Sequence, residues 1–410
     1  MLNGADKSLS LQLSLKGNNF MKRFSVTVFV MAMVMITGCS VEKDFVTLSG
    51  LNTADFHTTI DSVENKLHVI TNNNGVEACI INYGARLVSL MVPDRDGKMG
   101  DVVCGFSDIN GYTENSQNFG ATVGRYIGRI LGGKYVLDGD TVSLQTGSNG
   151  HCAHGGNPNF GARMWKTVSQ TGNSVTLRYV SPDGENGFPG NLTVNVTYSL
   201  TDEDELKIDY EAETDKATVV NLTNHSFFNV SGNPTTSVEN QTMFVRADSI
   251  TAYDDNKCVT GEYLSVTNTP FDFRTPKKIG ESIDADDPQL KATKGYDHCW
   301  ATGFSDIQGE PAAWIYDEVS GRKMEVCTTE PGIHIYTANG LKGNLQGKGG
   351  ILYEKRTSVC FEACHFQNSP NYEHFPSTVL RPGEKYVSST VYKFSKYFGA
   401  LDIGVGSANP

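Results

Sequence analysis

The sequence predicts an all-β protein, built as a single large antiparallel β-sandwich. Apolar and polar residues alternate along strand-length segments such as 192–200 and 206–212, which is the period of a strand with one buried face. Ser320-Gly321 separates the apolar segments 313–316 and 324–327, a spacing typical of a hairpin. No apolar stripe with helical spacing extends over about twelve residues. Folds that alternate strands with helices are therefore excluded.

The composition narrows the function classes. With 39% hydrophobic and 20% charged residues, the 410-residue chain has the composition of a globular protein rather than of a disordered or collagen-like one. Its formal net charge of -12 argues against a nucleic-acid-binding protein, which needs a basic surface to bind phosphates. The sequence indicates an acidic globular protein that is long enough to bury a large core.

The N-terminal segment predicts export and a lipid anchor. Lys22-Arg23 precedes the apolar stretch 24–36, which is too short to span a bilayer and is typical of a secretory signal. The motif that ends at Cys39 resembles the lipobox of bacterial lipoproteins, in which the cysteine is lipidated. We expect a leader over residues 1–38, with translation starting at Met21. The mature protein is expected to be an exported lipoprotein in the periplasm, anchored to the inner or the outer membrane. The alternative is a buried strand beside a chance cysteine.

The rest of the chain divides into a tether, one domain and a tail. We expect the tether over residues 39–55, the sandwich domain over 56–400 and the tail over 401–410. The eight cysteines beyond Cys39 are scattered without CxxC pairs, which argues against zinc ribbons and thioredoxin-like redox sites. Several of them lie on strand-like apolar segments and are expected to be small buried hydrophobic residues, and whether any of the eight form disulfides is left open.

Two glycine-rich segments carry polar groups that could bind a ligand. The segment 123–130 holds Arg125, a planar donor on a backbone that allows close approach; the alternative is a surface arginine on a loop. The segment 151–156 holds His151 and His154. These histidines could ligate a metal, but no further ligands lie nearby in the sequence. A loop histidine that donates to a ligand and a purely structural histidine are the other readings.

Two further segments suggest acid–base chemistry. In the segment 221–229, His225 lies among three asparagines and two phenylalanines, which could fix its tautomer and tune its pKa; a structural histidine fits equally well. In the segment 358–366, Glu362 is the one carboxylate of an apolar strand. If its face is solvated, Glu362 is ordinary. If that face lines a cleft, burial raises its pKa and makes it a candidate base.

Taken together, these motifs and their order resemble those of the aldose 1-epimerase (galactose mutarotase) family. The resemblance covers about residues 60–398. Each motif alone is weak, but six of them in one order are specific. The motifs are Gly-Arg-Tyr at 124–126, His-Gly-Gly at 154–156, Pro-Asp-Gly-Glu-Asn-Gly-Phe-Pro-Gly-Asn-Leu at 182–192, Asn-x-Thr-Asn-His-Ser-Phe-Phe-Asn at 221–229, Tyr-Asp-His at 296–298 and Phe-Glu-Ala-Cys-His-Phe at 361–366.

The resemblance implies a galactose mutarotase-like sandwich with a sugar cleft, no metal and no cofactor. It implies that Glu362 is the general base on the anomeric hydroxyl and that His225 is the general acid on the ring oxygen. It also implies that Arg125, His154 and Asp297 hold the sugar hydroxyls. The chain departs from the family pattern at Gly128, where asparagine is frequent, and at Cys364, where glutamine is commoner.

The expected function is therefore an aldose 1-epimerase that interconverts the α and β anomers of free aldohexoses such as glucose or galactose. One base and one acid suffice for this reaction, and each typically contributes about 10²–10⁴-fold. Trp165, Phe188 and Trp300 are candidates for an aromatic wall against the sugar. The preferred sugar and the oligomeric state are not predicted.

Three rival functions stay open at this point. A hexose-6-phosphate 1-epimerase would need a basic cluster at the cleft, where the sequence offers only Arg125 and Arg129. A non-catalytic carbohydrate-binding lipoprotein of the same fold would not need the acid–base pair. A metal-dependent sugar isomerase would use His151, His154 and His298.

Overall fold

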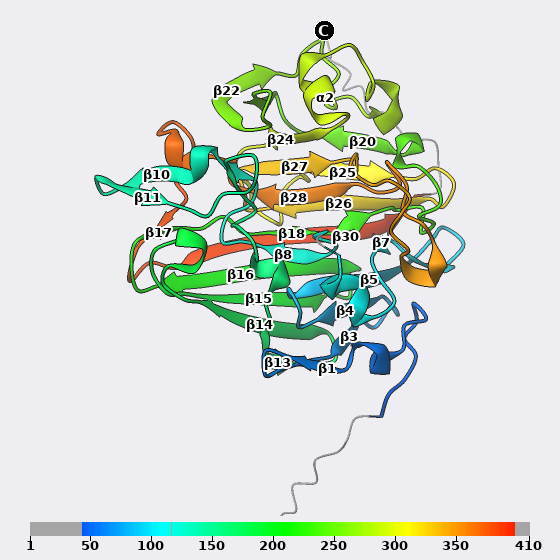
Figure 1. Cartoon of the computed structure of the whole chain (residues 1–410). Coiled ribbons are helices and arrows are strands. Elements are labelled where there is room, and N and C mark those ends of the chain that lie inside the picture. Colours follow the sequence, from blue (N-terminus) through cyan, green and yellow to red (C-terminus); the bar gives the residue numbers. More distant parts are fainter. Residues whose placement is uncertain (1–42, 116, 398–410) are drawn as a thin grey trace, which may run out of the picture. The chain divides into compact units, whose positions relative to one another are not determined.

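The computed structural model describes residues 43–115 and 117–397, and its strands belong to one compact unit, Asp44–Pro410. Strands dominate this unit (Figure 1). Within the described ranges the only α-helices are α1 (Ile109–Thr113) and α2 (Pro288–Thr293), and none is long and apolar enough to cross a membrane. All pairs between neighbouring strands in the sheets are antiparallel, so the predicted all-β class is confirmed.

A nine-stranded sheet forms one layer of the sandwich. The pattern of β15 alternates strictly between buried and half-buried residues, as its period-two sequence predicts. The predicted hairpin is also present, because β25 pairs with β26. In spatial order the strands are β13 (Lys166–Gln170), β14 (Ser174–Ser181), β15 (Leu192–Leu200), β16 (Glu205–Thr214), β30 (Tyr386–Lys396), β26 (Arg322–Thr328), β25 (Ala313–Tyr316), β20 (Thr242–Val245) and β23 (Lys277–Lys278).

Two smaller sheets pack against this layer. One continuous cluster of buried apolar side chains joins Val194 of the large sheet to Leu87 and Ile333 of the two smaller ones. The five-stranded sheet has the order β22 (Val259–Ser265), β21 (Ser249–Tyr253), β24 (Asp297–Ala301), β27 (Gly332–Tyr336) and β28 (Cys360–Cys364). The four-stranded sheet consists of β3 (Leu67–Thr71), β4 (Glu77–Ile81), β5 (Arg86–Pro93) and β6 (Met99–Asp101).

Six short two-stranded pairs complete the strands of the described residues, and three of them supply residues to the site described below. They are β1 (Thr58–Ile60) with β2 (Val63–Asn65), β7 (Val103–Cys104) with β19 (Phe227–Phe228), β8 (Ala121–Val123) with β18 (Thr223–His225), β9 (Arg129–Ile130) with β12 (Cys152–Ala153), β10 (Lys134–Leu137) with β11 (Asp140–Ser143), and β17 (Thr218–Val219) with β29 (Val379–Leu380). Single 3-10 turns cover Thr53–Phe56, Leu131–Gly133, Phe160–Ala162, Glu185–Gly187, Val238–Asn240, Ile279–Glu281, Lys348–Gly350 and Ser369–Asn371.

The domain begins earlier than the sequence predicts. The leader over residues 1–38, Cys39 and the tail over 401–410 lie outside the described residues. The expected tether, however, already packs onto the domain before residue 55, because Leu51 is buried in an apolar cluster together with Phe56. A bridge between Val46 and Asn52 folds the chain back there. The eight cysteines after residue 39 are all buried and free, as expected for small hydrophobic residues.

Candidate active site

A cavity of about 480 Å³ opens at the five-stranded sheet, within the size range of pockets that enclose small molecules. Its residues come from short strands and loops that are far apart in the sequence. They are Gln117, Asn118, Gly128, Arg129, His154, His225, Phe227, Lys257, Thr293, Lys294, Asp297, His334, Tyr336, Asn339, Gly340, Lys342, Glu362 and Gln367.

Strand register explains why polar side chains converge in this cavity. His334 of β27 lies directly opposite Glu362 of β28, and partners in register point to the same face of a sheet. The alternate residues of the same strands, Ile333, Ile335 and Phe361, belong to the apolar core. One face of this sheet is therefore core and the other carries the polar lining. Glu362 faces the cavity rather than open solvent.

Glu362 is a deeply buried carboxylate with unused hydrogen-bonding capacity. Its side chain is 1% exposed, and its Oε1 lies 3.6 Å from Nε2 of His225. No partner within the described residues reaches its other oxygen, Oε2. Burial, and then the nearby charge of Asp297, raises the pKa of Glu362 well above its ordinary value. The group thus has the environment of a proton-transfer residue, with one oxygen directed to a ligand.

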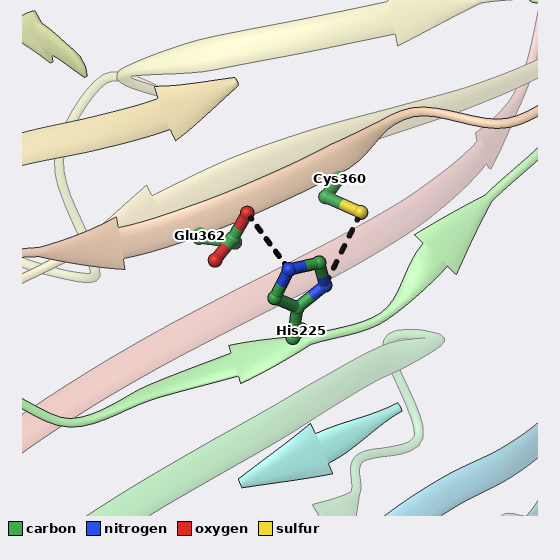
Figure 2. A group of neighbouring side chains, drawn as sticks. All are labelled: His225, Cys360 and Glu362. Carbon is green, nitrogen blue, oxygen red and sulfur yellow. Dashed lines mark hydrogen bonds and ion pairs between the residues drawn. The ribbon is translucent and has the colours of Figure 1, made fainter. Parts of the chain in front are cut away.

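Figure 2 shows His225 held between Glu362 and Cys360. The Sγ of Cys360 lies 3.5 Å from Nδ1 of the imidazole, and the ring stacks on Phe227 with centroids 5.1 Å apart. Burial raises the pKa of the Cys360 thiol, so the thiol keeps its proton. The thiol is therefore the hydrogen-bond partner of Nδ1, while Nε2 of the ring faces Glu362.

Burial also keeps His225 neutral. It lowers the pKa of this imidazole to about 3, with a further contribution from His154. The two rings are in edge contact, with centroids 5.9 Å apart, and burial lowers the pKa of His154 to about 4. His154 precedes Gly155, where a Cβ would lie 2.2 Å from the carbonyl oxygen of Gly124. The glycine therefore allows this loop to place His154 against the cavity.

A hydrogen-bonded chain fixes Asp297 at the cavity wall. Nε2 of His334 lies 2.9 Å from Oδ1 of Asp297, and Nδ1 of the same ring lies 3.1 Å from Nε2 of Gln367. His334 therefore donates to the carboxylate and accepts from the amide. Burial alone would raise the pKa of Asp297, but His334 and then Lys257 outweigh it and lower the pKa below the ordinary value. Asp297 is thus a charged acceptor.

Arg125 does not line the cavity, and the expectation that it holds a sugar hydroxyl is wrong. Its side chain is 1% exposed. The guanidinium donates to the carbonyl oxygens of Pro189 and Gly190 and to the hydroxyl of Ser181. It ties the loop before β15 to the rest of the domain. The arginine that lines the cavity is Arg129, four residues later in the same glycine-rich segment.

The expected aromatic wall is also wrong. Trp165, Trp300 and Phe188 are at most 1% exposed and pack in the apolar clusters. The aromatic rings at the cavity are Phe227 and Tyr336. His334 was missed as well, although it carries the same signal as Glu362, a polar residue within the apolar strand Gly332–Tyr336.

The histidines of the metal alternative do not form a cluster. In the described part of the chain, one group of three metal-binding side chains lies close together, namely His225, Cys360 and Glu362. Cys360 and Glu362 approach different nitrogens of the imidazole. One ligand atom from each of these three residues lies within 4.8 Å of the other two.

Comparison with known proteins identifies relatives over most of the chain. A family model described as aldose 1-epimerase matches residues 66–393, which include every residue of the cavity. Galactose mutarotase from Homo sapiens is 38% identical over 316 residues, or 77% of this chain and 90% of that protein. Aldose 1-epimerase from Escherichia coli (strain K12) is 34% identical over 331 residues, or 80% of this chain and 95% of that protein. A solved GalM/aldose epimerase homologue from C. elegans is 31% identical with a TM-score of 0.75, and the match covers 82% of this chain and 100% of that one.

Proposed function

The chain belongs to the aldose 1-epimerase family and is an isomerase, and we propose that Glu362 and His225 carry out its reaction on free aldohexoses such as galactose or glucose. The names of the relatives support this substrate class. One observation carries the assignment of residues. A buried carboxylate with one unpartnered oxygen lies 3.6 Å from a buried imidazole in a cavity of small-molecule size.

The reaction opens and recloses the sugar ring. Glu362 accepts the proton of the anomeric hydroxyl O1, the C1–O5 bond breaks, and His225 donates a proton to O5. The open-chain aldehyde then rotates about C1–C2. Reclosure runs the two transfers in reverse, with Glu362 as acid on O1 and His225 as base on O5, and gives the other anomer. No proton is gained or lost over the cycle.

Burial of Glu362 and His225 favours the opening of the sugar ring. The pair shares one proton, and the reactive arrangement is a carboxylate with an imidazolium. After ring opening the proton sits on Glu362 and His225 is neutral. Because burial raises the pKa of Glu362 and lowers that of His225, ring opening converts a buried ion pair into two neutral groups. The environment thus stabilises the open-chain intermediate relative to the charged pair.

Other groups of the cavity hold the sugar. Asp297 is a charged acceptor for hydroxyl groups, kept in place by His334. Burial favours neutral His154, which can donate and accept with its two ring nitrogens. Arg129 supplies planar donors, and the rings of Phe227 and Tyr336 offer apolar surface to the C–H face of the sugar.

Polarimetry on freshly dissolved α-D-galactose and α-D-glucose tests this assignment. The native protein is expected to accelerate mutarotation with and without EDTA. Glu362→Gln and His225→Asn should each lower kcat by about 10²–10⁴-fold, because each removes one proton-transfer group. Circular dichroism of each variant checks that it is folded. A Glu362→Gln variant with native kcat would remove the proposed base, and a native protein that accelerates neither sugar would favour a binding protein.

We also propose that the protein is exported and held at a membrane by a lipid on Cys39. The basic pair, the apolar stretch and the lipobox-like motif of residues 22–39 support this location.

A further inference from the structure

The lining of the cavity is cationic, although the chain as a whole carries a formal charge of -12. Two carboxylates, Asp297 and Glu362, contribute to the lining. Four cationic side chains surround them, from β9, the turn between β21 and β22, the end of α2 and the loop after β27. These side chains are Arg129, Lys257, Lys294 and Lys342.

The two carboxylates neutralise only part of this charge, because Asp297 forms an ion pair with one of the four cations, Lys257. Asp297 accepts from His334 at 2.9 Å and lies 3.8 Å from Lys257. Glu362 lies at the bottom of the cavity beside His225, where burial favours its uncharged form. The outer part of the cavity therefore keeps a positive charge.

Lys294 and Lys342 are the clearest sign of a ligand-directed charge. Both side chains are exposed, and neither forms an ion pair with another described residue. Several other cations of the chain form ion pairs, as in Lys348 with Asp101 at 2.6 Å and Arg356 with Asp284 and Glu239. Unpaired lysines at a cavity mouth attract an anion more strongly than lysines on a mixed-charge surface.

The depth of the groups fixes which end of a sugar meets the lysines. Glu362 and His225 are 1% and 7% exposed, so the anomeric centre lies deep in the cavity. The opposite end of the sugar then points to the exposed lysines. The cavity volume of about 480 Å³ corresponds to the volume of roughly sixteen water molecules of about 30 Å³ each. A hexose, with about a dozen non-hydrogen atoms, needs less volume than that. Space is left for a substituent.

We infer that the cavity accepts aldohexoses that carry an anionic substituent away from the anomeric carbon, a carboxylate or a phosphate, and prefers them to the neutral sugars. This inference rests on the proposed function, because the sugar must enter with its anomeric end first. The unpaired lysines at the mouth, Lys294 and Lys342, meet the anion. Arg129 and Lys257 add to the attraction from deeper positions.

The test compares neutral and anionic sugars with the same protein. We would measure kcat/KM for D-galactose, D-galacturonate and D-galactose 6-phosphate by NMR exchange between the anomers, corrected for the rate without protein. At about 10 mM salt both anionic sugars should exceed galactose by about tenfold or more, because cationic clefts raise association rates by about 10–10³-fold. The ratio should fall at about 0.5 M salt, where the screening length is only a few Å. If only one of the two anionic sugars is preferred, that result identifies the carboxylate or the phosphate as the anion that the lysines bind.

A matched pair of double variants distinguishes the effect of the two lysines at the cavity mouth from the effect of the net charge of the protein. Lys294→Ala combined with Lys342→Ala should lower the ratio of anionic to neutral kcat/KM by about fivefold or more. The control combines Lys166→Ala with Lys278→Ala, two exposed lysines outside the cavity, and changes the charge of the chain by the same amount. This control should keep the native ratio.

Three results would overturn the inference. One is equal kcat/KM for neutral and anionic sugars at low salt, and another is a ratio that the mouth variant leaves unchanged. The third is an equal drop in the control variant, which would assign the effect to net charge. Failure of the proposed function looks different, because the native protein would then accelerate none of the three sugars.

Discussion

Burial determines what Glu362 and His225 can do, more than their distance alone. A carboxylate and an imidazole 3.6 Å apart on a protein surface would form an ordinary ion pair. Here burial raises the pKa of the carboxyl and lowers that of the imidazole to about 3. Between these two values the pair holds one proton, which can move from one group to the other as the sugar ring opens.

The shared proton gives a specific pH dependence for kcat/KM on galactose. Below about pH 3 His225 is protonated as well as Glu362, so the pair holds two protons. Above the raised pKa of Glu362 the pair loses its only proton. We therefore expect a plateau between the pKa of His225 and the raised pKa of Glu362, and a loss of activity as the pH rises through the latter. Polarimetry at constant ionic strength, corrected for base-catalysed mutarotation, measures this profile.

Asp297 and His154 should not disturb that plateau. Asp297 has a lowered pKa, and His154 titrates at about 4, so neither changes charge between pH 5 and 7. A fall of kcat/KM on acidification from pH 7 to 5 would therefore contradict the shared proton. It would mean that Glu362 acts as a carboxylate of nearly ordinary pKa.

The sequence could predict those residues whose chemistry is unusual for their setting, but not the role of each arginine. Glu362 in an apolar strand and His225 among asparagines are unusual enough to be recognised in the sequence alone. The structure places both in the cavity. Arg125 and Arg129 lie in one glycine-rich segment. Nothing in that segment indicates which guanidinium forms hydrogen bonds within the protein and which one lines the cavity. The choice depends on the carbonyl groups of Pro189 and Gly190, which reach Arg125 only through the folded sheet.

At the scale of elements, β28 delivers two neighbouring functional side chains to one face. Cys360 and Glu362 are two residues apart, so both lie on the face of the strand opposite to Phe361, which packs into the largest apolar cluster. Cys360 itself belongs to a second apolar cluster. The same strand thus carries a carboxylate and the thiol that contacts Nδ1 of His225. The thiol acts through the imidazole and is a positioning residue.

This arrangement predicts different effects for two cysteines of one strand. Cys360→Ala removes the hydrogen-bond partner of Nδ1 of His225 and should lower kcat by about fivefold with little change in KM, as expected for one neutral hydrogen bond of about 1 kcal/mol. Cys360→Ser keeps a donor and should restore most of kcat. Cys364→Ala is the control, because it removes a buried thiol from the same face. An equal loss of kcat in Cys364→Ala, or no recovery in Cys360→Ser, would contradict the positioning role.

The individual strands could be read from the sequence, but their assembly could not. The alternation over Leu192–Leu200 reports a half-buried strand directly, because period two is a local property. The pairing of β16 with β30, by contrast, joins segments nearly two hundred residues apart, and no local pattern encodes it. The cavity depends on such distant pairs, so the sequence predicted its residues by motif rather than by position.

At the scale of the whole molecule, the strands form a unit that contains its own core. The apolar clusters begin at Leu51 and Phe56, and the cavity lies entirely between Gln117 and Gln367. The unit from Asp44 onward therefore has what folding and catalysis require. This organisation separates the activity of the protein from its location, and the two can be tested apart.

Cys39→Ala makes that separation measurable. Expressed in a bacterium, the full chain should incorporate labelled palmitate and sediment with the membranes, whereas Cys39→Ala should incorporate none and appear in the soluble fraction, because buried acyl chains contribute about 0.8 kcal/mol per CH₂ to membrane binding. Ser40→Ala is the control and should behave as the native chain. Purified native and variant proteins should share one kcat/KM on galactose, because residue 39 precedes the compact unit. Unlabelled native protein, or a variant that stays with the membranes, would contradict the anchor and leave the assignment of Glu362 and His225 untouched.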